Sequence, residues 1–212
     1  FKKEKPMVNL IWVTPKAMDV IAFAARVSNP SNQNNTKTAP KLLKYLKKEG
    51  HFSPFEMASA CIEINTTRDI ARQILRHRSF SFQEFSQRYA DPTKDLSFVS
   101  REARLQDTKN RQNSIETEDG ILQAKWALEQ KKVVKASQEA YNWAIENGIA
   151  KEQARAVLPE GLIESRLYMT GTLRSWMHFV ELRGGNGTQK EHTEIALQCK
   201  ELLVSAGADV WS

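Results

Sequence analysis

The sequence predicts a single α/β domain of the α+β kind, with a central mixed, mainly antiparallel sheet flanked by helices. One of these helices is long and lies in the second half of the chain. Three observations lead to this prediction. Short strand patterns recur between segments with apolar residues at helical spacing. One helical pattern continues from residue 120 to residue 147. No repeat and no linker divides the 212 residues, so residues 1–212 are expected to form one domain.

The first 50 residues predict one strand and two helices. Val8–Val13 is β-branched and aromatic, which indicates a strand. Pro15 suits the first turn of a helix that continues through Arg26. Asn29–Pro40 is rich in Asn, Ser, Thr and Pro without an apolar period, which predicts a loop. Lys41–Glu49 predicts a short amphipathic helix that ends at the next residue, a glycine.

The middle of the chain predicts a strand that leads into a helix. Glu56–Asn65 alternates between polar and apolar residues in its second half, as a strand does. The segment TRDIARQILRHR follows and predicts a helix capped by Thr66-Thr67, with Ile70 and Ile74 as its buried stripe. A further short strand is expected at Leu96–Val99.

The second half predicts mostly helices. Gln106–Asp119 is polar and is expected to be mobile. A long helix is expected over Gly120–Asn147 and a short one over Lys151–Leu158, which ends before a proline. The apolar period of the long helix runs through Leu122, Trp126, Val133, Ala140 and Trp143. A strand at Leu162–Thr170, a helix at Leu173–Arg183 with Leu173, Trp176, Met177 and Val180 inward, and a last helix at Thr188–Ser205 complete the expectation.

Cysteine usage and hydropathy bear on the compartment. The two cysteines, Cys61 and Cys199, are far apart and form no CxxC pattern, which favours a reducing, intracellular environment. No apolar run approaches the roughly 20 residues of a membrane helix, and no secretory signal pattern opens the sequence. We therefore expect a cytoplasmic protein. Phe1–Pro6 (FKKEKP) is interpreted as a leader.

The net charge of +6 suggests a partner that carries phosphate, either a nucleic acid or a nucleotide. Lysines cluster on predicted helix faces at 41–48 and 125–135. Arginines gather elsewhere, in short sets that include Gln, Ser or His. Arginine with amides and hydroxyls suits bidentate recognition of a defined phosphate or base.

Familiar catalytic motifs do not occur. The sequence has no GxGxxG, no GxxxxGK[ST] and no HExxH, and it has no close His/Cys cluster that would indicate a metal. Each of the four histidines is by itself more typical of a hydrogen-bonded structural residue than of a ligand. Neither cysteine has a neighbouring His or Arg in the sequence, so neither is interpreted as a nucleophile.

Three arginine-centred sets remain. One set is Arg155 alone, near the end of a predicted short helix. Another set is Arg174, His178 and Arg183, in which Arg174 and His178 are four residues apart on one helix that ends at Arg183. Such sets, without a nucleophile, favour a site that binds phosphate and an aromatic heterocycle and leaves the difficult chemistry to a cofactor. The first and largest set contains Gln73, Arg76, His77, Arg78, Glu84, Ser86 and Arg88.

The first of these sets resembles the signature of a known family. Arg76-His77-Arg78, seven residues and then Ser86 form the RHR-x7-S pattern of flavin-dependent thymidylate synthases. The segments HFSPFE, ARQILRHR, ARAVLP and TGTLRSWMHFVELR resemble other segments of that family, in the same order and over nearly the whole chain.

This resemblance implies a homotetramer with active sites shared between subunits. It implies bound FAD, dUMP as methyl acceptor, methylenetetrahydrofolate as carbon donor and NADPH as reductant. No cysteine attacks the base in this family, which agrees with the absence of an activated cysteine here.

The resemblance also assigns residues by position. Arg183 matches the arginine that polarises the pyrimidine, and because a guanidinium is not a practical base, its expected catalytic role is electrostatic activation. Ser86, with no adjacent general base, is expected to form hydrogen bonds. The residues implied for FAD are Ser53, Arg76, His77, Arg78, Glu84, Thr172, Arg174 and His178. The residues implied for dUMP are Gln73, Arg76, Ser86, Gln87, Arg88, Arg155 and Arg183.

Two alternatives remain open. A basic nucleic-acid-binding module would use the aromatics and arginines of 79–88 to stack bases, although no recognised nucleic-acid motif is present and the charge forms no continuous stripe. A catalytically impaired flavin- or nucleotide-binding relative is the other alternative. It is suggested by Thr172, which stands where the family often has Asn, and by Glu160–Arg166, which is one residue longer than the usual spacing.

Overall fold

A computed structural model describes residues 2–3 and 7–212. The leader expected at Phe1–Pro6 falls mostly outside these residues. Lys2–Lys3 forms strand β1, which pairs in parallel with strand β5 (Val99–Ser100). In the described part, no helix is both long enough and apolar enough to cross a membrane.

The central sheet has four strands in the order β2-β3-β8-β4, and every neighbouring pair is antiparallel. They are β2 (Met7–Val13), β3 (Ser59–Thr67), β8 (Glu164–Thr172) and β4 (Ser81–Glu84). β3 and β8 pair over their full length, from Ser59 opposite Thr172 to Thr67 opposite Glu164. The expected α+β fold is therefore confirmed, and the parallel pairing lies outside this sheet, between β1 and β5.

The two faces of the sheet differ in polarity, as the alternation in β3 predicts. Ile62 and Ile64 are fully buried on one face. Glu63 lies on the other face, where it accepts hydrogen bonds from the amides of Asn9 and Asn65, at 3.0 Å each. The hydrogen bond from Asn9 makes the largest contribution to lowering the pKa of Glu63.

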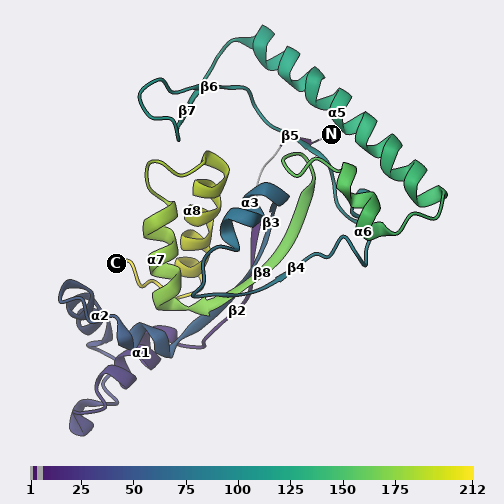
Figure 1. The fold of residues 1–212 in the computed structure, drawn as a ribbon. Helices are drawn as coiled ribbons and strands as arrows, with labels where there is room; N and C mark the ends of the chain where they lie inside the picture. The colour runs from purple at the N-terminus through teal and green to yellow at the C-terminus, as the bar shows by residue number, and fades with distance from the viewer. Residues whose placement is uncertain (1, 4–6) are drawn as a thin grey trace.

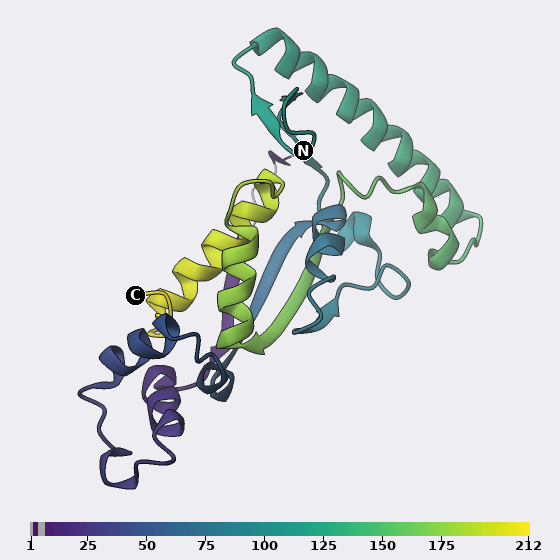
Figure 2. The ribbon, with the colours of Figure 1, turned by 60° about the vertical axis from the view of Figure 1, so that its left-hand side comes forward.

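Helices cover the apolar face and the ends of the sheet (Figures 1 and 2). Helices α7 (Leu173–Arg183) and α8 (Lys190–Ser205) lie side by side on the apolar face. Helix α3 (Arg68–Ile74) continues directly from β3. The remaining N-terminal elements are α1 (Ala17–Ala25), α2 (Ala39–Lys48) and the 3-10 segments η1 (Pro30–Asn32) and η2 (Ser53–Met57).

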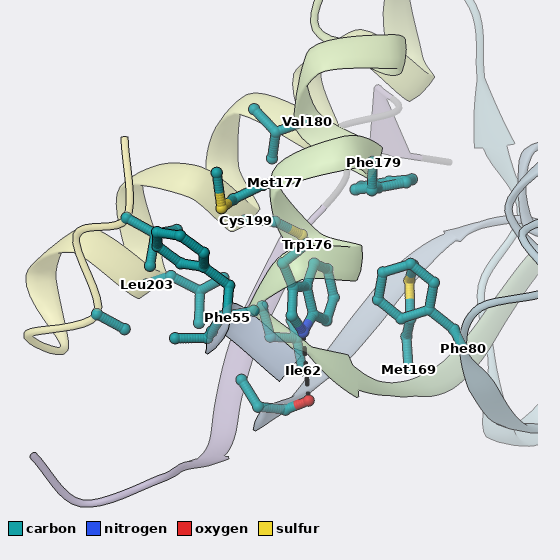
Figure 3. Packing of buried hydrophobic residues seen from close by; sticks show 14 of the residues in the cluster. Phe55, Ile62, Phe80, Met169, Trp176, Met177, Phe179, Val180, Cys199 and Leu203 are labelled. Atoms are coloured by element: carbon teal, nitrogen blue, oxygen red, sulfur yellow. Dashed lines mark hydrogen bonds between the residues drawn. The ribbon is translucent and has the colours of Figure 1, made fainter. Parts of the chain in front are cut away.

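The main core lies between α7, α8 and the sheet (Figure 3). The predicted inward face of α7 is confirmed, because its four residues are all buried. Trp176 is at the centre of this core, and its indole Nε1 donates a hydrogen bond to the carbonyl of Ala60 at 3.3 Å. Phe80 and Phe179 pack beside it. This cluster joins the signature segment to the helix that carries Arg183.

Helix α5 (Gly120–Glu146) is as long as predicted but packs on a small second core (Figure 1). Val134, Tyr141 and Ala144 face that core. The apolar stripe read from the sequence is exposed instead, with Trp126 at 44% and Trp143 at 61% exposure. The periodicity identified the helix, but packing against few neighbours leaves most of its apolar residues in contact with solvent.

The polar segment after β5 is more regular than the sequence suggests. It contains a β-hairpin of β6 (Arg104–Gln106) and β7 (Ser114–Glu116). Two glutamines of α5 hold the approach to this hairpin. The amides of Gln123 and Gln130 each accept a hydrogen bond from a backbone N–H and donate to a carbonyl, at Ala103 and Arg101 respectively. These tertiary contacts leave no period in the sequence, and the sequence analysis assigned no strand to residues 104–116.

Several predicted boundaries move by a few residues. The first helix begins at Ala17 because Lys16 adopts a left-handed conformation, with φ 52°. The second begins at Ala39, so Pro40 lies in its first turn rather than in the loop. The strand expected from Glu56 begins at Ser59, because η2 precedes it. The strand expected at Leu96–Val99 is reduced to β5 and a bridge between Phe98 and Ile163.

Three further helical segments differ from the prediction. The predicted helix at 151–158 is α6 (Lys151–Ala154) followed by the 3-10 segment η3 (Arg155–Val157). A short helix, α4 (Pro92–Asp95), was not predicted. The most consequential difference is α3, which ends at Ile74 instead of continuing to Arg78. The RHR triplet that opens the signature therefore lies in a turn, the signature turn, which leads into β4.

Candidate functional site

The signature turn separates the three residues of the RHR motif. The N–H of His77 donates to the carbonyl of Ile74 at 3.0 Å, and the N–H of Phe80 donates to the carbonyl of His77 at 3.3 Å. This tight turn buries His77 and leaves Arg76 and Arg78 exposed. Within the described residues, neither arginine forms an ion pair, so both guanidinium groups are available to a ligand.

Phe80 anchors this turn in the core. Its ring packs edge-to-face against Trp176, with centroids 4.8 Å apart (Figure 3). The ring also lies directly over Gly171, where an added Cβ would come within 2.5 Å of a ring carbon. Glycine at this position of β8 is therefore required for Phe80 to pack as it does, and Phe80 in turn holds the signature turn against α7.

His77 contacts the expected catalytic arginine. Arg183, the last residue of α7, donates a hydrogen bond from Nε to His77 Nε2 at 2.9 Å. Burial, and then the nearby charges of Arg183 and His178, lowers the pKa of His77 to about 4. The imidazole is therefore neutral at neutral pH. Since Nε2 accepts, its proton is on Nδ1.

A second buried histidine lies beside the first. His192 on α8 and His77 have ring centroids 6.2 Å apart at a steep angle of 88°. His192 Nδ1 is 3.3 Å from the amide oxygen of Gln73, and the Gln73 amide nitrogen donates to Gln189 Oε1 at 2.9 Å. His192 was interpreted from the sequence as a hydrogen-bonded structural residue, like the other histidines, and the structure agrees. Gln189 was not singled out, and its position near the start of the predicted last helix was the only signal.

A pocket of about 440 Å³ opens beside the first turns of α7. Arg174 and His178, which are four residues apart on α7, both line this pocket. Arg174 forms an ion pair with Glu56 of η2, and Ser175 Oγ donates to the carbonyl of Ser79. The lining residues are Phe52, Glu56, Ser79, Arg174, Ser175, Met177, His178 and Glu181. Glu56, Ser79 and Ser175 were not among the predicted site residues, although Glu56 belongs to the HFSPFE segment.

Ser53 and Thr172 flank this region. Ser53 is exposed at the start of η2, the segment that also carries Glu56. Thr172 is the N-cap of α7, and its Oγ1 accepts a hydrogen bond from the backbone N–H of Ser175 at 3.2 Å. A threonine can thus serve as the cap of this helix.

A separate group of residues forms where the loop after β4 meets α6. Arg88 forms an ion pair with Glu152 at 3.3 Å, and Arg155 Nε donates to the Glu152 carbonyl at 3.3 Å. The N–H of Arg88 also donates to Ser86 Oγ at 3.4 Å. The structure therefore brings Arg88 and Arg155, two of the residues that the resemblance implies for dUMP, to the same residue, Glu152. In Figures 1 and 2, α6 and α7 lie on opposite sides of the sheet.

Glu84 and Gln87 are the remaining predicted site residues of this part of the chain. Glu84 on β4 accepts a hydrogen bond from Ser165 Oγ at 2.8 Å and lies 3.7 Å from a guanidinium nitrogen of Arg68. Gln87 is buried, and its amide nitrogen has no hydrogen-bond partner within the described residues. A buried donor without a partner carries a free-energy cost that a ligand could relieve.

The chemistry available here is electrostatic rather than nucleophilic. Both cysteines are free and buried, and burial raises the pKa of the Cys199 thiol. Within the described residues, no group of three His, Cys, Asp or Glu side chains could hold a metal ion. The site instead offers fixed positive charge from Arg183 and exposed positive charge from Arg76 and Arg78. Such groups can bind anions and stabilise negative charge as it develops.

Comparisons with known proteins give one consistent result. Residues 9–206 match the family model described as thymidylate synthase complementing protein. A probable flavin-dependent thymidylate synthase of Paramecium bursaria Chlorella virus 1 is 52% identical over 188 residues, covering 89% of this chain and 86% of that protein. A flavin-dependent thymidylate synthase of Synechocystis is 48% identical over 185 residues, covering 87% of this chain and 83% of that protein.

Solved structures agree with the fold. The UMP/dUMP methylase PolB from Streptomyces cacaoi, bound with 5-Br dUMP, aligns with a TM-score of 0.83 and 26% identity, covering 96% of this chain and 91% of the other. The same methylase bound with 5-Br UMP aligns with a TM-score of 0.85 and 24% identity, covering 98% of this chain and 93% of the other. At 24% identity, the second similarity shows that the two proteins share a fold.

Proposed function

Because the chain belongs to the thymidylate synthase complementing protein family, that of the flavin-dependent thymidylate synthases, we propose that it forms dTMP from dUMP by reductive methylation. Methylenetetrahydrofolate is the proposed carbon donor, NADPH the reductant and FAD the hydride carrier, which makes the protein a methyltransferase. The observation that carries the proposal is Arg183, held by neutral His77 in the signature turn beside the exposed Arg76.

Arg183 is the proposed activating residue. Its guanidinium stays protonated, so it acts by stabilising the negative charge of a pyrimidine that has lost its N3 proton. Charge on the ring makes C5 more nucleophilic. The bond to His77 occupies Nε, which leaves both Nη groups to face the base. Gln73, held at its amide by His192 and Gln189, is the proposed second contact to the pyrimidine.

We propose that the pocket at the start of α7 receives part of a flavin. It combines the apolar Phe52 and Met177 with the charged Arg174 and the N-terminal end of α7, where a helix favours anions. FAD, when bound, supplies hydride transfer, which none of the side chains can provide. The residues proposed to hold it are Ser53, Arg76, His77, Arg78, Glu84, Thr172, Arg174 and His178. Since the His77 imidazole is buried, its main chain is the group proposed to face the flavin.

Arg88 and Arg155 are the proposed partners of the dUMP phosphate. Both are held at Glu152, close enough to converge on one anion, and Arg88 would exchange its carboxylate partner for the phosphate. Ser86 is proposed as a hydrogen-bond partner of dUMP. Gln87 has an unpaired buried amide and is proposed to pair with the same ligand.

No cysteine is needed as a nucleophile in this proposal. Cys61 and Cys199 are both buried, and the neutral thiol of Cys199 is favoured by its surroundings. This feature distinguishes the proposed reaction from one in which an enzyme thiolate adds to the base.

We propose a homotetramer with active sites shared between subunits. The exposed apolar residues of α5, among them Ile121, Leu128 and Trp143, suit burial against another copy. Arg88 and Arg155 meet at Glu152 of α6, and α6 lies across the sheet from α7 (Figures 1 and 2). A site that uses both arginines together with α7 would therefore be completed by a second copy. A cytoplasmic location is proposed because both cysteines are free.

Release of tritium from dUMP labelled at C5 tests the reaction. Protein, FAD, NADPH and methylenetetrahydrofolate should release tritium, and omission of NADPH or of the folate should stop it. Arg183→Ala should lower release by roughly 100- to 1,000-fold while leaving flavin bound. A folded, flavin-binding protein that releases none would contradict the proposal and indicate an impaired relative. Binding of random oligonucleotides that weakens steeply with salt would instead favour a nucleic-acid module.

A further inference from the structure

His77 and His192 occupy the junction of the signature turn with α7 and α8. His192 is fully buried and His77 is 8% exposed. Both rings pack against Phe179, at centroid distances of 5.0 Å for His77 and 5.7 Å for His192. Each ring also contacts one residue of the proposed pyrimidine site, and the two contacts use different ring nitrogens.

The contact of His77 fixes the plane of a guanidinium. Arg183 Nε donates to His77 Nε2 at 2.9 Å, so rotation of the guanidinium about its last bond would break this hydrogen bond. Only a neutral imidazole can accept at Nε2. The orientation of Arg183 therefore depends on an uncharged His77.

The contact of His192 fixes the orientation of an amide. Gln73 Nε2 donates to Gln189 Oε1, so Gln73 Oε1 is the acceptor toward His192 Nδ1. Reversal of the amide would place its NH₂ against the imidazole donor and its oxygen against the Gln189 oxygen. His192 and Gln189 together therefore select one of the two amide orientations of Gln73.

We propose that His77 and His192 are positioning residues for the pyrimidine site, with His77 acting through Arg183 at Nε2 and His192 acting through Gln73 at Nδ1. The inference rests on the proposed function, because it gives these two residues a task in binding and activating dUMP. Packing alone does not require it, since a phenylalanine would fill the same space against Phe179.

The charges around the pair agree with this role. Among the described residues, Arg183 and His178 on α7 are the charged groups that lower the pKa of His77, and the imidazole of His192 lies beside it. Arg183 and His77 are the groups that lower the pKa of His192. Burial and these neighbours lower the pKa of His192 to about 3 and that of His77 to about 4. A proton on His77 Nε2 would remove the acceptor that orients Arg183, and a proton on either ring would add a positive charge next to Arg183.

Crossed substitutions separate positioning from packing. In a glutamine side chain the amide reaches the place of histidine Nε2, whereas in asparagine it reaches the place of Nδ1. His77→Gln should therefore retain an acceptor for Arg183, and His77→Asn should not. At position 192 the order reverses, because His192→Asn keeps a donor for Gln73 and His192→Gln does not. A pure packing role predicts the same order at both positions, since asparagine always leaves the larger void.

The first readout is tritium release with saturating cosubstrates. We expect His77→Asn to lower kcat roughly 10- to 100-fold more than His77→Gln, since a hydrogen bond to a charged group is lost. We expect His192→Gln to raise the KM for dUMP roughly 2- to 10-fold more than His192→Asn. Equilibrium binding of dUMP, measured by calorimetry, should follow the KM order without depending on turnover. Thermal unfolding of all four variants controls for loss of fold.

The second readout is nitrogen-15 NMR of protein labelled at its four histidines. Two histidines should remain neutral, with the proton on Nδ1, at pH 5, and the signal of each should disappear in its own variants. The inference is overturned if asparagine is worse than glutamine at both positions, or if all four histidines titrate near pH 6.5. If wild-type protein releases no tritium, the proposed reaction fails, and the NMR and dUMP-binding results still decide whether the pair positions the site.

Discussion

Two arginines proposed to bind dUMP, Arg183 and Arg88, are held in opposite ways. Arg183 is half-buried and tied to a neutral acceptor that itself packs in the aromatic core. Arg88 is exposed and paired with a carboxylate, Glu152, on a neighbouring short helix. The first arrangement keeps a charge in one place before the substrate arrives. The second holds a charge loosely until an anion competes for it. The difference suits a base-activating group, which must be preorganised, and a phosphate-binding group, which need not be.

The strongest test of this difference is to remove Arg183, the preorganised charge. Arg183→Ala should lower kcat for tritium release by roughly 100- to 1,000-fold, the range for loss of one preorganised electrostatic group. Arg183→Lys should recover only part of this loss, because lysine keeps the charge but has no planar group to orient against His77. Arg111→Ala, which removes an exposed arginine of the β6–β7 hairpin, serves as the control and should cost much less. Equal losses in all three would contradict a specific role.

The buried pair also makes the stability of this region sensitive to pH. The folded-state pKa of each histidine lies below the unfolded value near 6.5, so the unfolded chain binds more protons at acidic pH. Stability is therefore full above pH 6.5 and is lost as the pH falls toward 4. Between pH 7 and pH 4.5 we expect a loss of about 2 kcal/mol per histidine, measured by urea unfolding.

His192→Asn provides the matched comparison, since asparagine does not titrate. Its unfolding free energy should depend less on pH than that of the wild type over the same interval. Parallel pH curves for the two proteins would show that His192 is not neutral in the folded state.

Substitution of two glycines tests how Phe80 anchors the signature turn. Gly171→Ala places a Cβ against the ring of Phe80 and should lower the free energy of unfolding by about 1–3 kcal/mol. Gly120→Ala, at the start of α5, has open space around it and should be neutral or slightly stabilising. Chemical denaturation measures both. Equal effects would mean that Phe80 moves aside at little cost.

Substitution at the exposed Arg88–Glu152 ion pair should have the smallest effect on stability. Glu152→Gln removes an exposed ion pair, so unfolding should change by no more than about 0.5 kcal/mol. Because the carboxylate no longer competes with phosphate, dUMP should bind roughly 2- to 5-fold more tightly. Titration of dUMP by calorimetry checks this. Weaker binding would mean that Glu152 orients Arg88 for phosphate instead of competing with it.

Local pattern alone determined a large part of this protein. The helical period of α7 predicted its buried residues. The 28-residue helical pattern predicted the position of α5, and the alternation in β3 predicted which residues lie on each face of the sheet. The RHR-x7-S spacing identified the family. These features depend on residues close in the chain, and the periods of 3.6 and 2 residues are written directly in the order of side chains.

Only the tertiary structure decided what those segments do together. It ended α3 at Ile74, turned His77 inward and Arg76 outward, and placed His192 against Gln73, 119 residues away in the chain. It also left the apolar stripe of α5 exposed and brought Arg88 to Arg155 at Glu152. Contacts between distant residues leave no period in a sequence, because each depends on how several elements pack at once.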